Sequence, residues 1–145
     1  MKKQLTTLLL FIILISAHAQ SVEIFTTKDG AINGYDPIAY FKEGQAVKGK
    51  KEFSTIWNGA RWLFSSEQNL ETFKSDPEKY APQYGGYCAY GASEGHKSPT
   101  QSDAFTIVND KLYLNYNKDV KQEWSKNQKE RIQKADETWP TLKNQ

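Results

Sequence analysis

Two aromatic-rich runs on either side of Asn58-Gly59 constrain the fold of this 145-residue chain more than any other local pattern. The runs are Glu52–Trp57 and Ala60–Phe64. Asn and Gly adopt positive φ at little cost, and a two-residue turn of this kind matches the twist of antiparallel strands. The pattern predicts a β-hairpin.

A second hairpin and a capped helix are also expected. The runs Phe105–Val108 and Lys111–Tyr116 flank Asn109-Asp110, which is again a turn pair. Ser65 or Ser66 follows the first hairpin and can cap a helix, because a serine hydroxyl accepts a hydrogen bond from a free N–H of the first turn.

The C-terminal segment predicts an amphipathic helix that begins after Asn117 and closes at Pro140. Its apolar positions follow helical spacing: Val120, Trp124, Ile132, Ala135 and Trp139. The chain has no internal repeat and no low-complexity linker. We expect one small α+β domain with short antiparallel hairpins, a Tyr/Gly-rich segment over residues 80–95 and this C-terminal helix.

Residues 1–19 have the three parts of a secretory signal peptide. Lys2-Lys3 precede the apolar run Leu8–Ile15, and Ala17-His18-Ala19 offers a small-x-small cleavage site. The whole apolar stretch from Leu5 to Ala17 is too short to cross a bilayer, which takes about 20 residues, so a retained anchor is the weaker alternative. The prediction is a periplasmic or secreted protein of residues 20–145, with no membrane span after cleavage.

The net charge of +2 comes from the same segment. Lys2 and Lys3 account for the excess of 19 basic over 17 acidic residues, so the mature chain is formally neutral. Its final helix mixes both signs, which is typical of a solvated face, and we expect no nucleic-acid partner.

Cys88 and His96 are the only cysteine and histidine of the predicted mature chain. Thiolate and imidazole suit copper and zinc, so the two residues are candidate metal ligands. Their separation is not diagnostic, and a free cysteine is often a small buried hydrophobe. A thiol enzyme is a further alternative, but no C-x-x-C or acyl-transfer signature accompanies Cys88, and we expect a binding protein rather than an enzyme.

The Tyr/Gly-rich segment offers a metal-independent alternative. Tyr80, Tyr84 and Tyr87 would share one face if the segment were helical. Glycines in the segment permit close approach to a ligand or to another part of the chain: Gly85, Gly86 and Gly91. A small-molecule or protein-binding module could use this surface, with weaker candidate ligand-binding residues at Asp36, Tyr87 and Tyr90.

Three stretches together resemble the YHS-domain family: Gly34–Phe41, Asn58–Ser66 and Phe73–Gly91. Asp110–Val120 is similar to the tail of stand-alone exported members, so the core resemblance covers residues 34–120. Members of that type are mostly uncharacterised, and the resemblance implies a fold more than an activity.

The resemblance also implies where a metal would bind. YHS modules of metal-transporting ATPases carry cysteines thought to bind soft metals, and the corresponding positions here are Ala39, Ser65 and Asn69. None supplies a thiolate, so that site is not inherited. The leading hypothesis is therefore an exported YHS-domain binding protein with copper or zinc at Cys88 and His96. The alternative is a metal-independent module in which Cys88 is part of the core.

Overall fold

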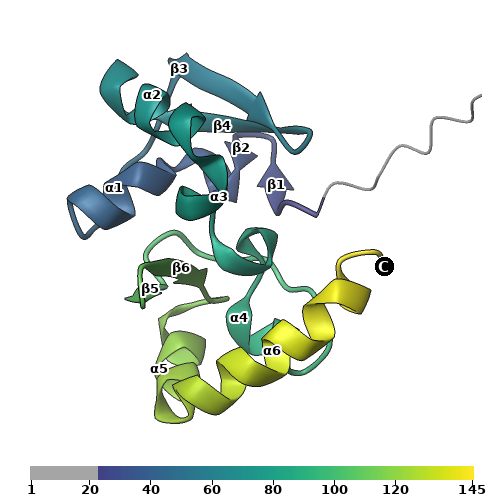
Figure 1. The fold of residues 1–145 in the computed structure, drawn as a ribbon. Coiled ribbons are helices and arrows are strands. Elements are labelled where there is room, and N and C mark those ends of the chain that lie inside the picture. Colours follow the sequence, from purple (N-terminus) through teal and green to yellow (C-terminus); the bar gives the residue numbers. More distant parts are fainter. Residues whose placement is uncertain (1–22) are drawn as a thin grey trace, which may run out of the picture.

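The computed structural model describes residues 23–145, so the predicted signal peptide lies outside the described residues. Figure 1 shows two lobes, one built by the first part of the described chain and one by the last part. We call residues 24–82 the N-terminal lobe and residues 87–145 the C-terminal lobe. No helix of residues 23–145 is long and apolar enough to span a membrane.

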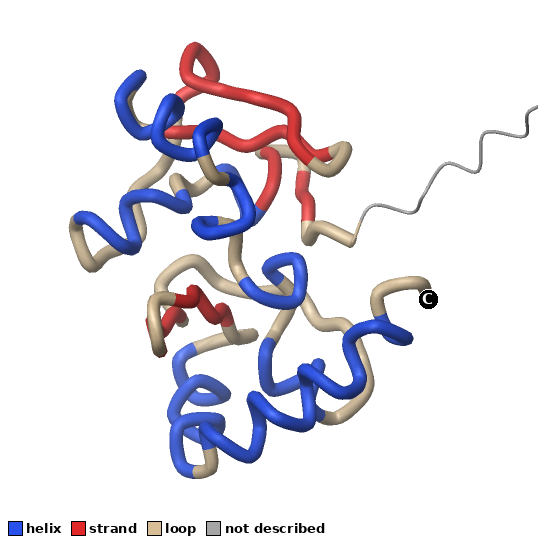
Figure 2. The backbone as a smooth tube through the Cα atoms, viewed as in Figure 1, coloured by secondary structure: helices blue, strands red, loops and turns tan. Residues whose placement is uncertain are grey.

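The N-terminal lobe contains two strand pairs and three short helices, with the β3–β4 hairpin as its longest strand pair (Figure 2). Its elements are β1 (Thr26–Thr27), β2 (Gly30–Ala31), the 3₁₀ turn η1 (Ile32–Gly34), α1 (Pro37–Lys42), β3 (Lys50–Trp57), β4 (Ala60–Phe64), α2 (Glu67–Ser75) and α3 (Pro77–Tyr80).

The C-terminal lobe is mostly helical and begins after the 3₁₀ turn η2 (Gln83–Gly86), which joins the lobes (Figure 1). Its elements are α4 (Ala89–Ser93), β5 (Phe105–Val108), β6 (Lys111–Leu114), α5 (Lys118–Lys126) and α6 (Gln128–Leu142). Each strand pairs antiparallel with one neighbour, and the mixture confirms the α+β prediction.

Both predicted hairpins are present. Trp57 pairs with Ala60 across Asn58-Gly59, and Val108 pairs with Lys111 across Asn109-Asp110. All four turn residues have positive φ, between 46° and 70°, as a turn of this hand requires. The second hairpin is shorter than predicted, because β6 ends at Leu114; the Asn115 N–H still bonds to the Ala104 carbonyl beside β5, and the Asn115 side chain bonds to α4.

The C-terminal helix differs from the prediction in two ways. Asn117 does cap it, accepting from the Val120 N–H at 2.8 Å. However, the helix breaks at Asn127 into α5 and α6, and the apolar spacing continues across the break. Pro140 lies inside α6 and does not close it, since the Lys143 N–H still bonds to the Trp139 carbonyl.

The three tyrosines do not share a helix face. Tyr80 ends α3, whereas Tyr84 and Gly85 have φ of 56° and 62° in η2, which turns the chain sharply. The glycines serve close packing within the chain. A Cβ on Gly85 would stand 1.6 Å from the Glu23 carbonyl oxygen, and one on Gly86 would stand 2.5 Å from Ile32.

Two hydrophobic cores meet at β6. Leu112 and Leu114 pack into the core of the N-terminal lobe, with Trp62, Phe64 and other buried side chains. Tyr113, between them, packs with Trp124 in the core of the C-terminal lobe. Alternation of side chains along a strand therefore connects the two cores.

Candidate functional site

Asp36 caps the start of α1 and its side chain is completely buried. Its Oδ1 accepts hydrogen bonds from the backbone N–H groups of Ile38, at 2.8 Å, and Ala39, at 3.3 Å. The first turn of a helix leaves these donors without helical partners. Pro37, with its fixed φ, suits the first helical position. The Asp-Pro pair therefore starts the helix and fixes the carboxylate.

The second oxygen of Asp36 joins α1 to the end of β4 and to α2. Oδ2 accepts from the N–H and the Oγ of Ser65, both at 2.8 Å, and from Nδ2 of Asn69 at 2.7 Å. Lys42 Nζ donates to the Asn69 Oδ1 at 3.3 Å. We call Asp36, Ser65 and Asn69 the Asp36 cluster. Five donors occupy its carboxylate, which has about four lone-pair directions.

Cys88 is buried, with 2% of its surface exposed, and caps the start of α4. Its Sγ accepts from the backbone N–H groups of Gly91, at 3.4 Å, and Tyr116, at 3.3 Å. The thiol in turn donates to the Asn115 Oδ1 at 3.5 Å. The sulfur thus has a complete set of partners inside the protein, as in the predicted alternative of a packed cysteine.

Asn115 is the residue at this site that the sequence analysis did not single out. It is completely buried, and its Oδ1 also accepts from the Tyr90 N–H at 3.1 Å, which fixes the amide orientation. Its Nδ2 has no hydrogen-bond partner among the described residues. A polar residue at the end of a hairpin strand was the available signal, but only the fold brings it to α4.

The other candidate residues divide between two places. The His96 ring lies against Gly91, the residue whose N–H bonds to Cys88, but His96 is exposed and its Nδ1 is 3.2 Å from Ser98 Oγ. Tyr87 turns instead towards Phe25 and Trp139, with ring centroids at 5.6 and 6.3 Å.

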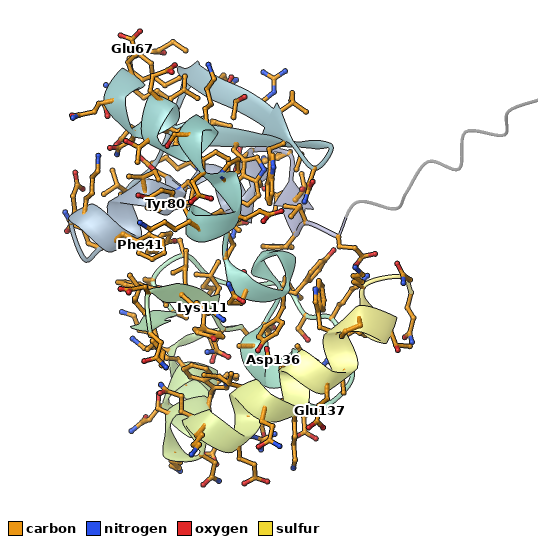
Figure 3. The ribbon with its side chains drawn as sticks, viewed as in Figure 1. Phe41, Glu67, Tyr80, Lys111, Asp136 and Glu137 are labelled. Atoms are coloured by element: carbon orange, nitrogen blue, oxygen red, sulfur yellow. The ribbon has the colours of Figure 1, made fainter. Side chains whose placement is uncertain are left out.

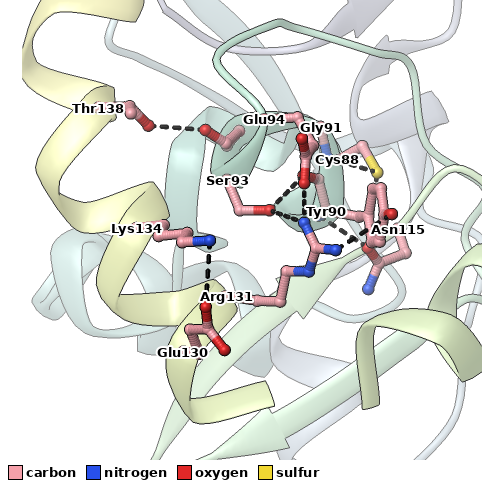
Figure 4. A network of polar contacts seen from close by, with 11 residues as sticks. Cys88, Tyr90, Gly91, Ser93, Glu94, Asn115, Glu130, Arg131, Lys134 and Thr138 are labelled. Carbon is pink, nitrogen blue, oxygen red and sulfur yellow. Dashed lines mark hydrogen bonds and ion pairs between the residues drawn. The ribbon is translucent and has the colours of Figure 1, made fainter. Parts of the chain in front are cut away.

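Tyr90 belongs to a polar network that fastens α6 to α4 (Figure 4). The Arg131 guanidinium lies 4.0 Å from the centre of the Tyr90 ring and donates to its hydroxyl at 3.1 Å. Arg131 also bonds to Ser93 Oγ at 3.1 Å and pairs with Glu94. The hydrogen bond and charge of Arg131 hold the pKa of Glu94 below its ordinary value.

The structure therefore gathers Cys88, Tyr90 and His96 around α4 and places Asp36 in a separate cluster of the N-terminal lobe. Within residues 23–145, no three His, Cys, Asp or Glu side chains come close enough together to hold a metal ion.

An open cleft of about 870 Å³ lies between the two lobes. The N-terminal lobe contributes Trp57 and Asn58 of the hairpin turn and Glu78 of α3. The C-terminal lobe contributes Lys111 and Asp136, which Figure 3 labels near the boundary of the lobes, together with Trp139.

Tyr84 forms part of the buried wall of this cleft. Its hydroxyl donates to Asp136 Oδ1 at 2.8 Å, and its ring contacts Trp139 with centroids at 5.9 Å. Burial, and then the hydrogen bond to Asp136, raise the pKa of Tyr84 far above its ordinary value. The phenol therefore stays protonated and holds the Asp136 carboxylate at the cleft.

Lys97 contacts three residues of the cleft lining, Glu23, Trp139 and Lys143, without lining the cleft itself. Its ammonium group pairs with Glu23 at 2.9 Å and donates to the backbone carbonyls of Lys143 and Gln145, each at 3.2 Å. It also lies 6.0 Å from the centre of the Trp139 ring. We call this arrangement the Lys97 clasp, because it joins the first described residue to the end of α6.

Residues 38–84 match the family model of the YHS domain. The chain therefore contains a YHS domain. The match begins in α1, includes the first hairpin and α2, and ends at Tyr84, so it coincides with most of the N-terminal lobe. No curated protein and no solved structure matched the chain.

The YHS domain of this chain does not offer the metal site that the resemblance implies. The three positions of the expected cysteines, Ala39, Ser65 and Asn69, all contact the Asp36 carboxylate, Ala39 through its backbone N–H. Their donor set is a backbone amide, a hydroxyl and a carboxamide, which lack the softness that copper favours, and the carboxylate is saturated. In this YHS domain the three positions support a hydrogen-bonded cross-link.

Proposed function

We propose that this YHS-domain protein is an exported binding protein, periplasmic or secreted, that takes a small ligand in the cleft between its lobes without a metal ion. The observation that carries this proposal is the cleft itself, to which both lobes contribute polar and aromatic side chains. Its size lies in the range of small-molecule sites, about 300–1,000 Å³.

The polar side chains of the cleft support this assignment. Those of Asn58, Glu78, Gln83, Lys111 and Lys143 make no hydrogen bond or ion pair with another residue of the described chain. The candidate ligands of the other sites are already engaged: the Asp36 carboxylate has five donors, and the Cys88 sulfur has three polar neighbours.

A copper or zinc site at Cys88 is the second candidate. It is favoured by one observation, that the Cys88 sulfur and the His96 ring both contact Gly91. Binding there would require the sulfur to give up its backbone donors and become accessible.

Elemental analysis of the protein purified from its native compartment distinguishes the two candidates. We expect no stoichiometric copper or zinc, and equal uptake of Cu(I) and Zn(II) by the wild type and by Cys88→Ser in equilibrium dialysis. One metal ion per chain that is lost in Cys88→Ser and weakened in His96→Ala would overturn the metal-independent proposal.

Export is tested separately by cell fractionation. We expect the full chain in the periplasm or the medium with residues 1–19 removed, and a chain lacking residues 2–19 in the cytosol. Mass spectrometry of the mature N-terminus, with Ala19→Arg as a variant that blocks the small-x-small cleavage site, checks the expectation. A full-length chain retained in the cytosol would contradict it.

A further inference from the structure

We infer that the cleft takes a neutral ligand rich in hydroxyl groups and built on a ring, that is, a saccharide. The inference rests on the proposed function, because it names the ligand class of the same cleft. Three properties of the lining carry it: its charge balance, its free hydrogen-bonding groups and its apolar surfaces.

The first property is the charge of the lining. Glu23 is already paired with Lys97. The remaining charged side chains of the lining are two carboxylates, Glu78 and Asp136, and two ammonium groups, Lys111 and Lys143, so their charges cancel. The lining has no excess of either sign, so it gives no net attraction to a phosphate or a polyamine. A lining built for a strongly charged ligand would be dominated by the opposite sign.

The second property is that the lining presents donors and acceptors together. Lys111 and Lys143 can only donate, the carboxylate of Glu78 can only accept, and the amides of Asn58 and Gln83 do both. A hydroxyl group both donates and accepts, so each of these side chains can bind one. A ligand that offers only donors or only acceptors would leave half of them unpaired.

The third property is apolar surface placed between the polar groups. The half-buried indoles of Trp57 and Trp139 come from different lobes, and the rings of Pro82 and Pro140 lie in the same lining. Each indole presents an apolar body together with an N–H donor. The C–H faces of a sugar ring fit such surfaces while its hydroxyls reach the polar groups.

The experiment is a titration of the ¹⁵N-labelled mature protein, followed through the indole N–H signals of its tryptophans. The probes are cellobiose and N,N′-diacetylchitobiose, with 1,4-diaminobutane and inorganic phosphate as charged comparisons. Trp62 and Trp124 are completely buried in the two cores and serve as internal controls. We expect a saccharide to shift the signals of Trp57 and Trp139 saturably. The affinity should change less than about twofold between low salt and about 0.3 M salt, because a neutral ligand is not screened.

Two variants locate the binding. Glu78→Ala removes an exposed carboxylate of the lining, and we expect saccharide affinity to fall about tenfold or more, as for a lost hydrogen bond to a charged group. Glu137→Ala is the matched control, because it removes an equal charge from α6 outside the lining and should leave the affinity unchanged.

The outcomes separate the inference from the proposed function. If the diamine or phosphate shifts Trp57 and Trp139 saturably and neither saccharide does, the ligand class is wrong and the cleft remains the binding site. If none of the four probes shifts either signal, both the ligand class and the cleft are rejected. An equal loss of saccharide affinity in Glu78→Ala and Glu137→Ala would also show that the cleft is not the binding site.

Discussion

A single carboxylate, that of Asp36, connects α1, the end of β4 and α2. Its burial is favourable only while its charge is matched by hydrogen bonds, because an ionised group without partners is very costly in a protein interior. The hydrogen bonds that saturate this carboxylate therefore make Asp36 a point on which the fold of the N-terminal lobe depends.

We expect Asp36→Asn to lower the free energy of unfolding by about 3 kcal/mol, because an amide N–H₂ cannot accept from both Ser65 and Asn69. Urea denaturation measures the change. Asp76→Asn is the control, since Asp76 is an exposed N-cap and asparagine caps as well as aspartate, so we expect a change below about 0.5 kcal/mol. Equal stability of Asp36→Asn and wild type would show that the cluster is not a cross-link.

Gly85 is required for a different reason, namely the approach of another backbone segment. Gly85→Ala places a methyl group on the Glu23 carbonyl and is expected to cost more than about 3 kcal/mol in the same assay. Gly95→Ala, at similarly positive φ with nothing within 4 Å, should show only the backbone strain, about 1–2 kcal/mol. Similar decreases in the free energy of unfolding in the two variants would contradict the close approach of the Glu23 carbonyl to Gly85.

At the scale of elements, local signals predicted the structure wherever a few adjacent residues determine it. The Asn58-Gly59 turn and the Asn117 cap need only their own neighbours, and both are confirmed. The break at Asn127 does not follow from the sequence pattern, because the apolar spacing continues through it; beyond the break, Arg131 of α6 bonds to Ser93 of α4.

The candidate sites were harder to predict for the same reason. Asp36 was singled out from its own segment, but its partners Ser65 and Asn69 are 29 and 33 residues away. Cys88 was singled out as a unique residue, whereas its burial depends on Asn115, at a distance of 27 residues. The cleft has no local signal at all, because it exists only once the two lobes are placed side by side.

The attachment of α6 to α4 should depend on pH through Glu94. Its pKa is lowered by Arg131, so the pair stabilises the fold above the ordinary glutamate pKa of 4.5 and the contribution is lost as pH falls through the lowered value. We expect the wild type to lose more stability than Glu94→Gln between pH 6 and acidic pH, by a small amount because Glu94 is exposed.

Urea denaturation at several pH values measures this difference between the two proteins. Glu137→Gln, which alters an exposed carboxylate on α6 away from Arg131, is the control and should follow the wild type. Parallel pH profiles for Glu94→Gln and the wild type would show that the ion pair does not fasten the helices.

At the scale of the whole molecule, the segment that matches the YHS family does not supply its complete hydrophobic core. Its core includes Leu112 and Leu114, which β6 supplies from beyond the end of the match, while Tyr113 belongs to the other core. We therefore expect the two lobes to unfold together.

Leu114→Ala tests this coupling. We expect the free energy of unfolding to fall by about 3 kcal/mol, as for other large-to-small core substitutions. The decrease should be the same whether unfolding is followed through the indole N–H signal of Trp62 or through that of Trp124. Ile56→Ala, at a side chain 63% exposed, should change stability by less than about 0.5 kcal/mol. A shift of the Trp62 transition with an unchanged Trp124 transition would show independent lobes.

The Lys97 clasp has a consequence for the order of events during synthesis. Lys97 binds Glu23 and the carbonyls of Lys143 and Gln145 through one ammonium group, so this contact cannot form until residues 143–145 have been synthesised. The contact that fastens the first described residue therefore forms late in synthesis.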